Sequence, residues 1–140
     1  MKAARHFFVG REVLPNVPLR NFINIEELIM KLPRNAIPFG KFAEADILIA
    51  SPVDFDPLGV IELDSSEHDL PVAKRRDLLK DKILEKAEIP IVRIRVENPA
   101  TITSDDFFEI LCMEASKFSQ FQLAHWRERE THPLMVPVAS

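Results

Sequence analysis

Three acidic residues near the middle of the chain have the types and spacing of a metal site. Asp46 lies at the start of the apolar run ADILIA (45–50). Glu62 and Asp64 lie at the end of a second apolar run, LGVIELD (58–64). If the two runs pair as an antiparallel hairpin, the start of one lies beside the end of the other. The pattern therefore predicts that the three carboxylates converge at one end of a sheet.

Carboxylates brought within a few ångströms of one another repel unless a cation neutralises them. Oxygen ligands suit a hard ion, so Mg²⁺ or Mn²⁺ is the expected cofactor. Such an ion polarises a phosphoryl oxygen and activates a water molecule. The alternative for each acid is structural, because a single carboxylate often pairs with an arginine or accepts a hydrogen bond from the backbone. The three acids together favour a site.

A histidine follows the acids in the sequence and is a further candidate for the site. His68 lies four residues beyond Asp64, at the turn into a basic segment. A neutral imidazole can act as a general base near pH 7. The alternative is an ordinary surface histidine or a cap. We expect His68 to position or deprotonate the attacking water.

A locally basic segment lies next to the predicted site. Residues 74–95 hold eight lysines and arginines against four acids, a local charge of +4 within a chain of net charge −4. Four of these cations are candidates for phosphate contacts: Arg76, Lys80, Arg93 and Arg95. Cations of this kind position a nucleic-acid backbone. The alternative is that they simply balance the neighbouring acids.

The elements that must position these residues follow from periodicity and from the prolines. Alternating or continuous apolar runs predict four strands, and helical spacing predicts three helices. The expected strands cover residues 11–19, 45–50, 58–64 and 89–96, with the proline-bearing first one at an edge. The expected helices cover residues 24–32, 71–87 and 104–118, with Asn24 and Ser104 as N-caps.

These elements predict an α/β (mixed α+β) fold. The unit from 58 to 96 should be a right-handed parallel crossover. A central mixed sheet of about four strands, flanked by helices, follows. We expect the packed domain to cover residues 1–118 and the remainder, 119–140, to be a partly helical or loosely ordered tail.

Composition restricts the setting and the class of protein. A chain of 140 residues suits one domain with a hydrophobic core, and no apolar run approaches the roughly 20 residues that span a bilayer. Its single cysteine excludes an intrachain disulfide, and its start shows no secretory signal, so a cytoplasmic protein without a membrane partner is expected. The acidic net charge argues against a nonspecific nucleic-acid coat.

The order of the motifs resembles the PD-(D/E)XK restriction-endonuclease-like superfamily. More narrowly, it resembles the domain of unknown function 2726 and nucleases of the very-short-patch-repair type. The resemblance covers about residues 12–96 and rests on ADILIA, then IELD, a histidine, RD and a strand that ends in arginine. It implies a three-layer nuclease fold in which Asp46 and Glu62 bind the metal. It also implies that Asp77, the acid of RD, orients His68 or an arginine.

The chain departs from that pattern at specific positions. The superfamily usually has lysine where Asp64 stands, which leaves His68 first and Lys80 second as the group that assists the attacking water. The family usually has glycine where Glu88 stands, so we expect a left-handed residue there, at a cost of about 1 kcal/mol. The opening residues MKAARHFF carry no acid, and we expect the first helix of the family to be short or absent.

Together, these observations predict a metal-dependent nuclease that hydrolyses phosphodiester bonds, with DNA favoured over RNA as substrate. The alternative is a nucleic-acid-binding or assembly module that retains the nuclease fold without the chemistry. A third possibility is a protein-interaction domain whose last helix packs on a partner.

Overall fold

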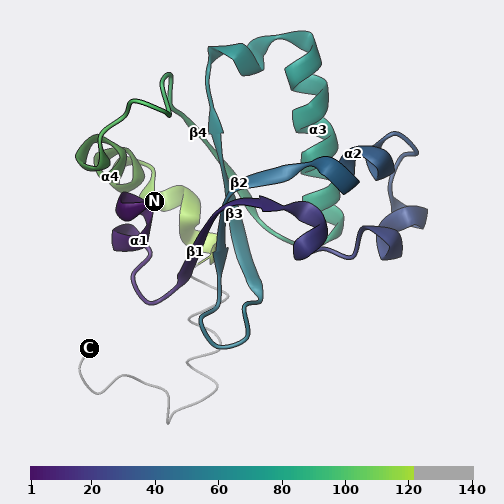
Figure 1. Cartoon of the computed structure of the whole chain (residues 1–140), viewed down its shortest axis with the longest axis horizontal. Coiled ribbons are helices and arrows are strands. Elements are labelled where there is room, and N and C mark those ends of the chain that lie inside the picture. Colours follow the sequence, from purple (N-terminus) through teal and green to yellow (C-terminus); the bar gives the residue numbers. More distant parts are fainter. Residues whose placement is uncertain (122–140) are drawn as a thin grey trace.

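A four-stranded mixed sheet forms the centre of the molecule, with its strands in the order β1-β2-β3-β4 (Figure 1). The structure is a computed structural model that describes residues 1–121, without the side chains of Ile29, Glu67 and His68. The strands are β1 (Glu12–Pro18), β2 (Glu44–Ala50), β3 (Pro57–Asp64) and β4 (Ile91–Arg95). The α-helices are α1 (Lys2–Phe7), α2 (Ala36–Phe42), α3 (Pro71–Lys86) and α4 (Ser104–Met113). The 3₁₀ segments are η1 (Leu19–Asn21), η2 (Ile25–Lys31), η3 (Ser66–Asp69) and η4 (Ala115–Phe118).

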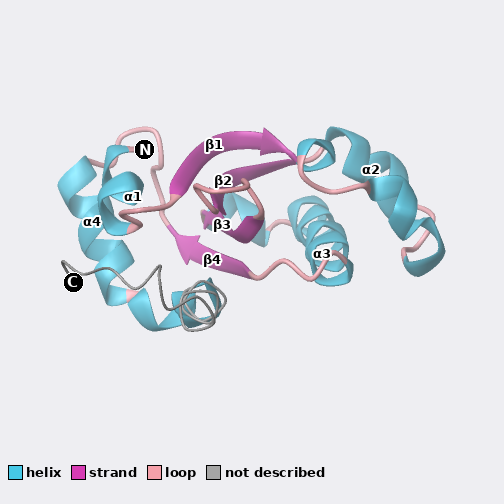
Figure 2. Cartoon of the chain, turned by 90° about the horizontal axis from the view of Figure 1, so that it is seen from below, coloured by secondary structure: helices cyan, strands magenta, loops and turns pink. Residues whose placement is uncertain are grey.

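The helices cover the sheet on both faces, so the molecule has three layers (Figure 2). Helices α1 and α4 pack with Ile47 and Ile61 on one face of the sheet. Helices α2 and α3 pack on the other face with Leu48 and Val60, the neighbours of those residues along β2 and β3. Because successive side chains of a strand point to opposite faces, β2 and β3 each contribute side chains to the apolar core on both faces of the sheet. This alternation also sends Asp46 and Glu62 toward α3.

The predicted strand pairing is confirmed. Strands β2 and β3 form an antiparallel pair in which Ile47 lies opposite Ile61. Strands β3 and β4 are parallel, with Glu62 opposite Arg93, and α3 makes the connection between them. Strand β1, which contains Pro15 and Pro18, pairs only with β2 and lies at an edge of the sheet. The predicted mixed α+β class with a four-stranded sheet is therefore correct.

The first helix is short, which is one of the two outcomes expected for it, and its residue Ala4 and the next residue after the helix, Phe8, are buried in the core. Two other helices differ from their predictions. Helix α2 was not predicted, because Pro38 lies within it. Proline is tolerated there because the first turn of a helix has no carbonyl partner for its N–H groups. The predicted helix at 24–32 is a 3₁₀ segment, although Asn24 caps it as expected and accepts a hydrogen bond from the Glu27 N–H.

The last predicted helix begins and ends differently. Thr103, not Ser104, is the N-cap, and its hydroxyl accepts a hydrogen bond from the Asp106 N–H at 3.1 Å. The α-helix ends at Met113, and η4 follows. Phe107 and Leu111 of this helix are buried in the molecule's own core, so its apolar face already has a partner within the chain.

The packed core extends past the predicted boundary at residue 118. Phe121 is fully buried, and its ring lies against Gly59 of β3. A Cβ atom at Gly59 would lie 2.2 Å from that ring, so only glycine leaves room for it. The rest of the predicted tail, 122–140, lies outside the described residues. None of the described helices is long and apolar enough to cross a bilayer.

The C-terminus of α3 is a Schellman motif with a strained residue. The Ile89 N–H donates to the Leu84 carbonyl at 2.9 Å, and the Glu88 N–H donates to the Glu85 carbonyl at 3.0 Å. Glu88 has a φ of +60°, as the resemblance implied. Its side chain is exposed, so a glycine at this position would remove no buried contact.

Replacing Glu88 with glycine should raise the free energy of unfolding by about 1 kcal/mol, because glycine adopts positive φ without a clash at Cβ. Urea denaturation of the purified protein measures the change. The control Glu88→Ala keeps the Cβ atom and should remain near the wild-type stability. If the glycine variant is no more stable than the alanine variant, the strain assigned to this position is wrong.

Candidate functional site

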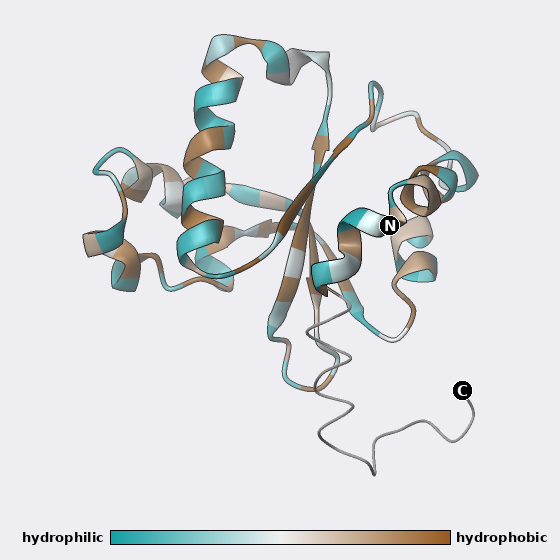
Figure 3. Ribbon diagram, turned by 180° about the vertical axis from the view of Figure 1, so that it is seen from behind, coloured by the Kyte–Doolittle hydropathy of each residue, from teal (hydrophilic) through white to brown (hydrophobic). Residues whose placement is uncertain are grey.

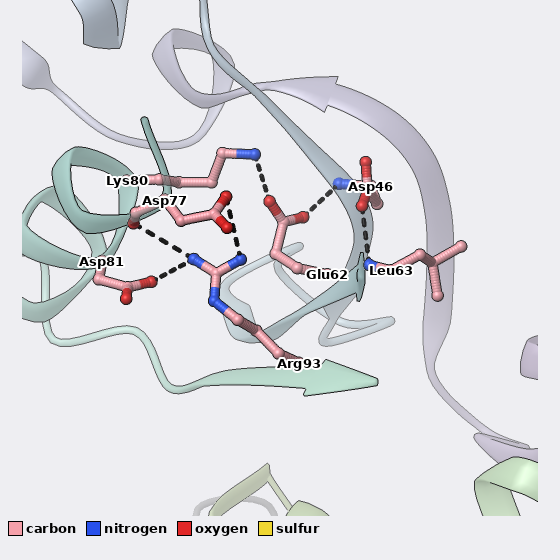
Figure 4. A network of polar contacts seen from close by, with 7 residues as sticks. All are labelled: Asp46, Glu62, Leu63, Asp77, Lys80, Asp81 and Arg93. Atoms are coloured by element: carbon pink, nitrogen blue, oxygen red, sulfur yellow. Dashed lines mark hydrogen bonds and ion pairs between the residues drawn. The ribbon is translucent and has the colours of Figure 1, made fainter. Parts of the chain in front are cut away.

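Asp46 and Glu62 meet where the β2–β3 pairing ends, one residue beyond the Ile47–Ile61 pair. The Asp46 N–H donates to Glu62 Oε2 at 2.7 Å. The Leu63 N–H donates in return to Asp46 Oδ2 at 2.8 Å (Figure 4). Each carboxylate thus accepts a hydrogen bond from the backbone of the opposite strand. The two acids fix the separation of the strands and lie side by side.

Glu62 is a buried acid, only 2% exposed. Lys80 reaches it from α3, and the Lys80 ammonium donates a hydrogen bond to Glu62 Oε1 (Figure 4). Lys80 lies one helical turn beyond Arg76, on the side of α3 that faces the sheet. The parallel crossover therefore brings a cation of α3 onto an acid 18 positions earlier in the chain.

The environment of Glu62 raises the pKa of its carboxyl above the ordinary value of 4.5. Burial is the largest cause, because it disfavours the charged form. The negative charge of Asp46 acts in the same direction. The Lys80 ammonium and the Asp46 N–H oppose the rise without cancelling it. A cation added beside Glu62 would offset both causes.

A second ion-pair cluster lies beside the first, around Arg93 of β4. Its guanidinium donates to Asp81 Oδ1 at 2.5 Å and to the Asp77 carbonyl at 3.2 Å, and it lies 3.4 Å from Asp77 Oδ1 (Figure 4). Burial acts to lower the pKa of Arg93, but the hydrogen bond and charge of Asp81, with the charge of Asp77, raise it overall. Arg93 therefore ties β4 to α3. Asp77 contacts an arginine, one of the two partners expected for it.

Arg95 and Asp64 lie opposite one another on β4 and β3. Arg95 donates to Asp69 Oδ1 at 3.1 Å and lies 3.5 Å from a carboxylate oxygen of Glu97. The pKa of Arg95 is raised, chiefly by the hydrogen bond to Asp69, and the charge of Asp64 contributes to the rise. Asp64 thus lies in the field of Arg95.

The predicted convergence of three carboxylates is only partly present. Among the side chains that the structure describes, which exclude those of Glu67 and His68, no group of three or more Asp, Glu, His and Cys is placed to hold one metal ion. The pair of Asp46 and Glu62 is assembled, while Asp64 lies farther along β3, beside Arg95. The end of the β2–β3 pairing explains the difference, because the paired residues of these strands end at Ile47 and Ile61, before Asp64 is reached. The backbone of His68 lies in η3, and its side chain is outside the description.

A hollow of about 880 Å³ opens next to this site, between α2 and α3. Lys80 and Asp77 form part of its wall, and so do Arg76 and the start of β2 at Glu44. Arg76 is exposed, as a phosphate contact requires. The hollow therefore reaches the site at Lys80, the partner of Glu62.

Two contacts of the site do not follow from the sequence patterns. The sequence predicts Lys80 as a phosphate contact and as the second candidate for assisting the attacking water, but it does not indicate the bond between Lys80 and Glu62. Asp81 was not singled out, although it lies four residues after Asp77 on the same face of α3 and contacts the same arginine. This spacing is the signal that could have identified it.

The fold and the site define a three-layer α/β domain with paired acids at the end of its central hairpin. The chain belongs to the family described as "Protein of unknown function (DUF2726)", whose sequence profile matches residues 6–110. That range contains every residue of the site described above. No curated protein and no solved structure gives a significant match to the chain.

The raised pKa of Glu62 predicts a specific pH dependence of stability. A carboxyl with a raised folded pKa binds its proton more tightly in the folded state, so its contribution falls as pH rises above 4.5. The free energy of unfolding of the wild type, minus that of Glu62→Gln, should therefore decrease as pH rises from 4 toward the folded pKa. Urea denaturation in EDTA across this range measures the difference. If this difference stays constant or increases as pH rises, then burial does not disfavour the ionised form of Glu62.

Proposed function

We propose that this chain is a metal-dependent nuclease domain of the PD-(D/E)XK restriction-endonuclease-like kind, and that it hydrolyses phosphodiester bonds of DNA in preference to RNA. The observation that carries the proposal is the contact of three groups from three elements. Buried Glu62 of β3 lies against Asp46 of β2 and against the Lys80 ammonium of α3. Two acids and a lysine gathered beside an open hollow suit phosphoryl chemistry.

The residues present fit a hard divalent cation. Asp46 and Glu62 offer only oxygen atoms, which Mg²⁺ and Mn²⁺ prefer. The desolvation of Glu62 and the charge of Asp46 both favour an added positive charge at this position. When bound, the ion supplies polarisation of a phosphoryl oxygen and a more acidic water molecule. We assign the binding to Asp46 and Glu62, with Asp64 assisting through water.

Lys80 is our first candidate for the group that works beside the metal ligands. Its ammonium is held at Glu62, beside the proposed metal ligands. We propose that it stabilises the negative charge that develops on a phosphate oxygen and orients the attacking water by a hydrogen bond. The contact with Glu62 moves Lys80 ahead of His68, which was the first candidate from the sequence. In this proposal Lys80 takes the role of the lysine that the superfamily usually has at the position of Asp64.

The four predicted phosphate-binding cations divide into two pairs. Arg76 and Lys80 line the hollow next to the acids, and we propose that they contact the nucleic-acid backbone. Arg93 and Arg95 each contact two acids of the chain. We propose that Arg93 and Arg95 act mainly in holding β4 against its neighbours.

A second function is favoured by the way Lys80 contacts Glu62. The ammonium neutralises the buried acid without a metal, and the described residues hold no three-ligand cluster. A domain with this arrangement could bind nucleic acid and serve in assembly without cutting it. Metal affinity separates the two functions.

The nuclease proposal predicts that the purified protein cuts DNA with Mg²⁺ or Mn²⁺ and not in EDTA. Asp46→Asn and Glu62→Gln should each lower the rate by at least about a hundredfold, because each removes a metal ligand and its charge. Asp105→Asn, an exposed acid of α4, is the matched control and should cut as the wild type does. Calorimetric titration with Mn²⁺ should show binding that both site variants lose.

A folded wild-type protein that neither cuts nor binds Mn²⁺ would overturn the nuclease proposal. Binding of DNA under those conditions would support the non-catalytic module.

The choice of Lys80 over His68 makes a separate prediction about which of the two substitutions lowers the cleavage rate more. Lys80→Ala should lower the cleavage rate by about a hundredfold or more, and by more than His68→Ala does. Lys86→Ala, an exposed lysine at the end of the same helix, should have little effect. Circular dichroism of each variant checks that α3 remains folded. If His68→Ala has the larger effect, then the order of the two candidates is reversed.

A further inference from the structure

The hollow beside the candidate site is lined by exposed apolar side chains as well as by charged ones. The hollow between α2 and α3 is lined by Phe39, Phe42, Leu70 and Val72 in addition to its charged residues. Three of these side chains are largely exposed: Phe42 at 80%, Leu70 at 61% and Val72 at 54%. Exposed apolar side chains gathered in one hollow indicate a ligand with an apolar face.

A second hollow, of about 680 Å³, lies on the other side of Phe42. It is formed by η1, the start of η2 and the end of α2, and Phe42 lines both hollows. Phe42 is the last residue of α2 and is largely exposed. The two hollows therefore have one exposed aromatic residue in common.

Each of the two hollows also has two cations in its lining. Arg20 and Lys41 line the second hollow, and the Arg20 guanidinium is held by a 2.5 Å hydrogen bond to the Lys41 carbonyl. Arg76 and Lys80 line the first hollow. The acids that share these walls are Glu26, Glu44 and Asp77, of which Asp77 contacts Arg93. An aromatic ring common to two hollows, each with a pair of cations, matches a nucleic-acid strand, whose bases alternate with phosphates along its length.

We propose that Phe42 stacks against an unpaired base of a single-stranded DNA segment next to the phosphate held at Lys80. The proposal rests on the function proposed above and assigns it a substrate class, single-stranded DNA or a single-stranded end. Lys80 fixes the position, because it contacts Glu62 and also lines the hollow. A phosphate at Lys80 places the neighbouring nucleotide over Phe42, and Arg20 and Lys41 meet the phosphate beyond it.

The chemistry favours an unpaired strand over a duplex. In a duplex the faces of the bases are covered by their neighbours, so an exposed phenyl ring gains little contact. An unpaired base can turn its face to the ring, and stacking of this kind does not depend on the base. Each hollow is in the size range of pockets that hold small organic ligands, roughly 300–1,000 Å³.

Binding of DNA without metal tests the proposal separately from cleavage. Fluorescence anisotropy in EDTA would follow a labelled oligonucleotide of about 12 thymidines, the length of a typical single-strand site. Phe42→Ala should weaken its binding by about tenfold, and Phe42→Trp, which keeps an aromatic face, should restore it. Phe55→Ala is the matched control, since Phe55 is 60% exposed in the β2–β3 loop and lines neither hollow. Its affinity should equal that of the wild type.

The same variants tested on a blunt duplex complete the experiment. Phe42→Ala should leave duplex binding unchanged. The proposal is overturned if the wild type does not bind the oligonucleotide, if Phe42→Ala binds it like wild type, or if the duplex loses as much affinity as the single strand. Because no metal is present, these outcomes do not depend on whether the domain cuts DNA. A domain that fails the cleavage test but shows the selective loss would be a single-strand-binding module.

Discussion

The burial of the Glu62 carboxylate is the constraint on which the rest of the site depends. A carboxylate removed from water costs several kcal/mol unless charges and hydrogen bonds surround it. Here the Asp46 N–H and the Lys80 ammonium supply them, one from the neighbouring strand and one from the crossover helix. Removing one partner of such a pair typically costs about 3–5 kcal/mol. The position of α3 along β3 is therefore coupled to the charge at Glu62.

Helix α3 contacts the sheet in two different ways along its length. At its C-terminal end Ile83 and Leu84 are fully buried in the apolar core. Toward its N-terminus the contacts are ionic, through Asp77, Lys80 and Asp81. Figure 3 shows hydrophilic and hydrophobic residues alternating along the whole of α3, beside the apolar strands. The ionic half of the helix also borders the open hollow, because Asp77 and Lys80 line it.

The strands and the pairing of two acids could be predicted from the sequence, because they depend on local periodicity and on one hairpin. Ile47 and Ile61 alternate with Leu48 and Val60, and this period of two places Asp46 and Glu62 on one face. Contacts between distant segments could not be predicted in the same way. The bond between Lys80 and Glu62 depends on the rotation of α3 over the sheet, which charge patterning does not determine. Helix α2 was missed because Pro38 is tolerated only in a first turn, and the side chain of its N-cap, Asn35, makes no capping hydrogen bond.

We propose that Asp46 and Glu62 hold a divalent cation beside Lys80. The most direct measurement is the anomalous difference density of crystals soaked in Mn²⁺. The account predicts a peak in contact with carboxylate oxygens of both Asp46 and Glu62, with the Lys80 ammonium moved from Glu62 toward the open hollow. Crystals that show no peak there, and in which Lys80 still donates to Glu62, would contradict it. In that case the site would consist of the ion pair between Lys80 and Glu62 and would bind no metal ion.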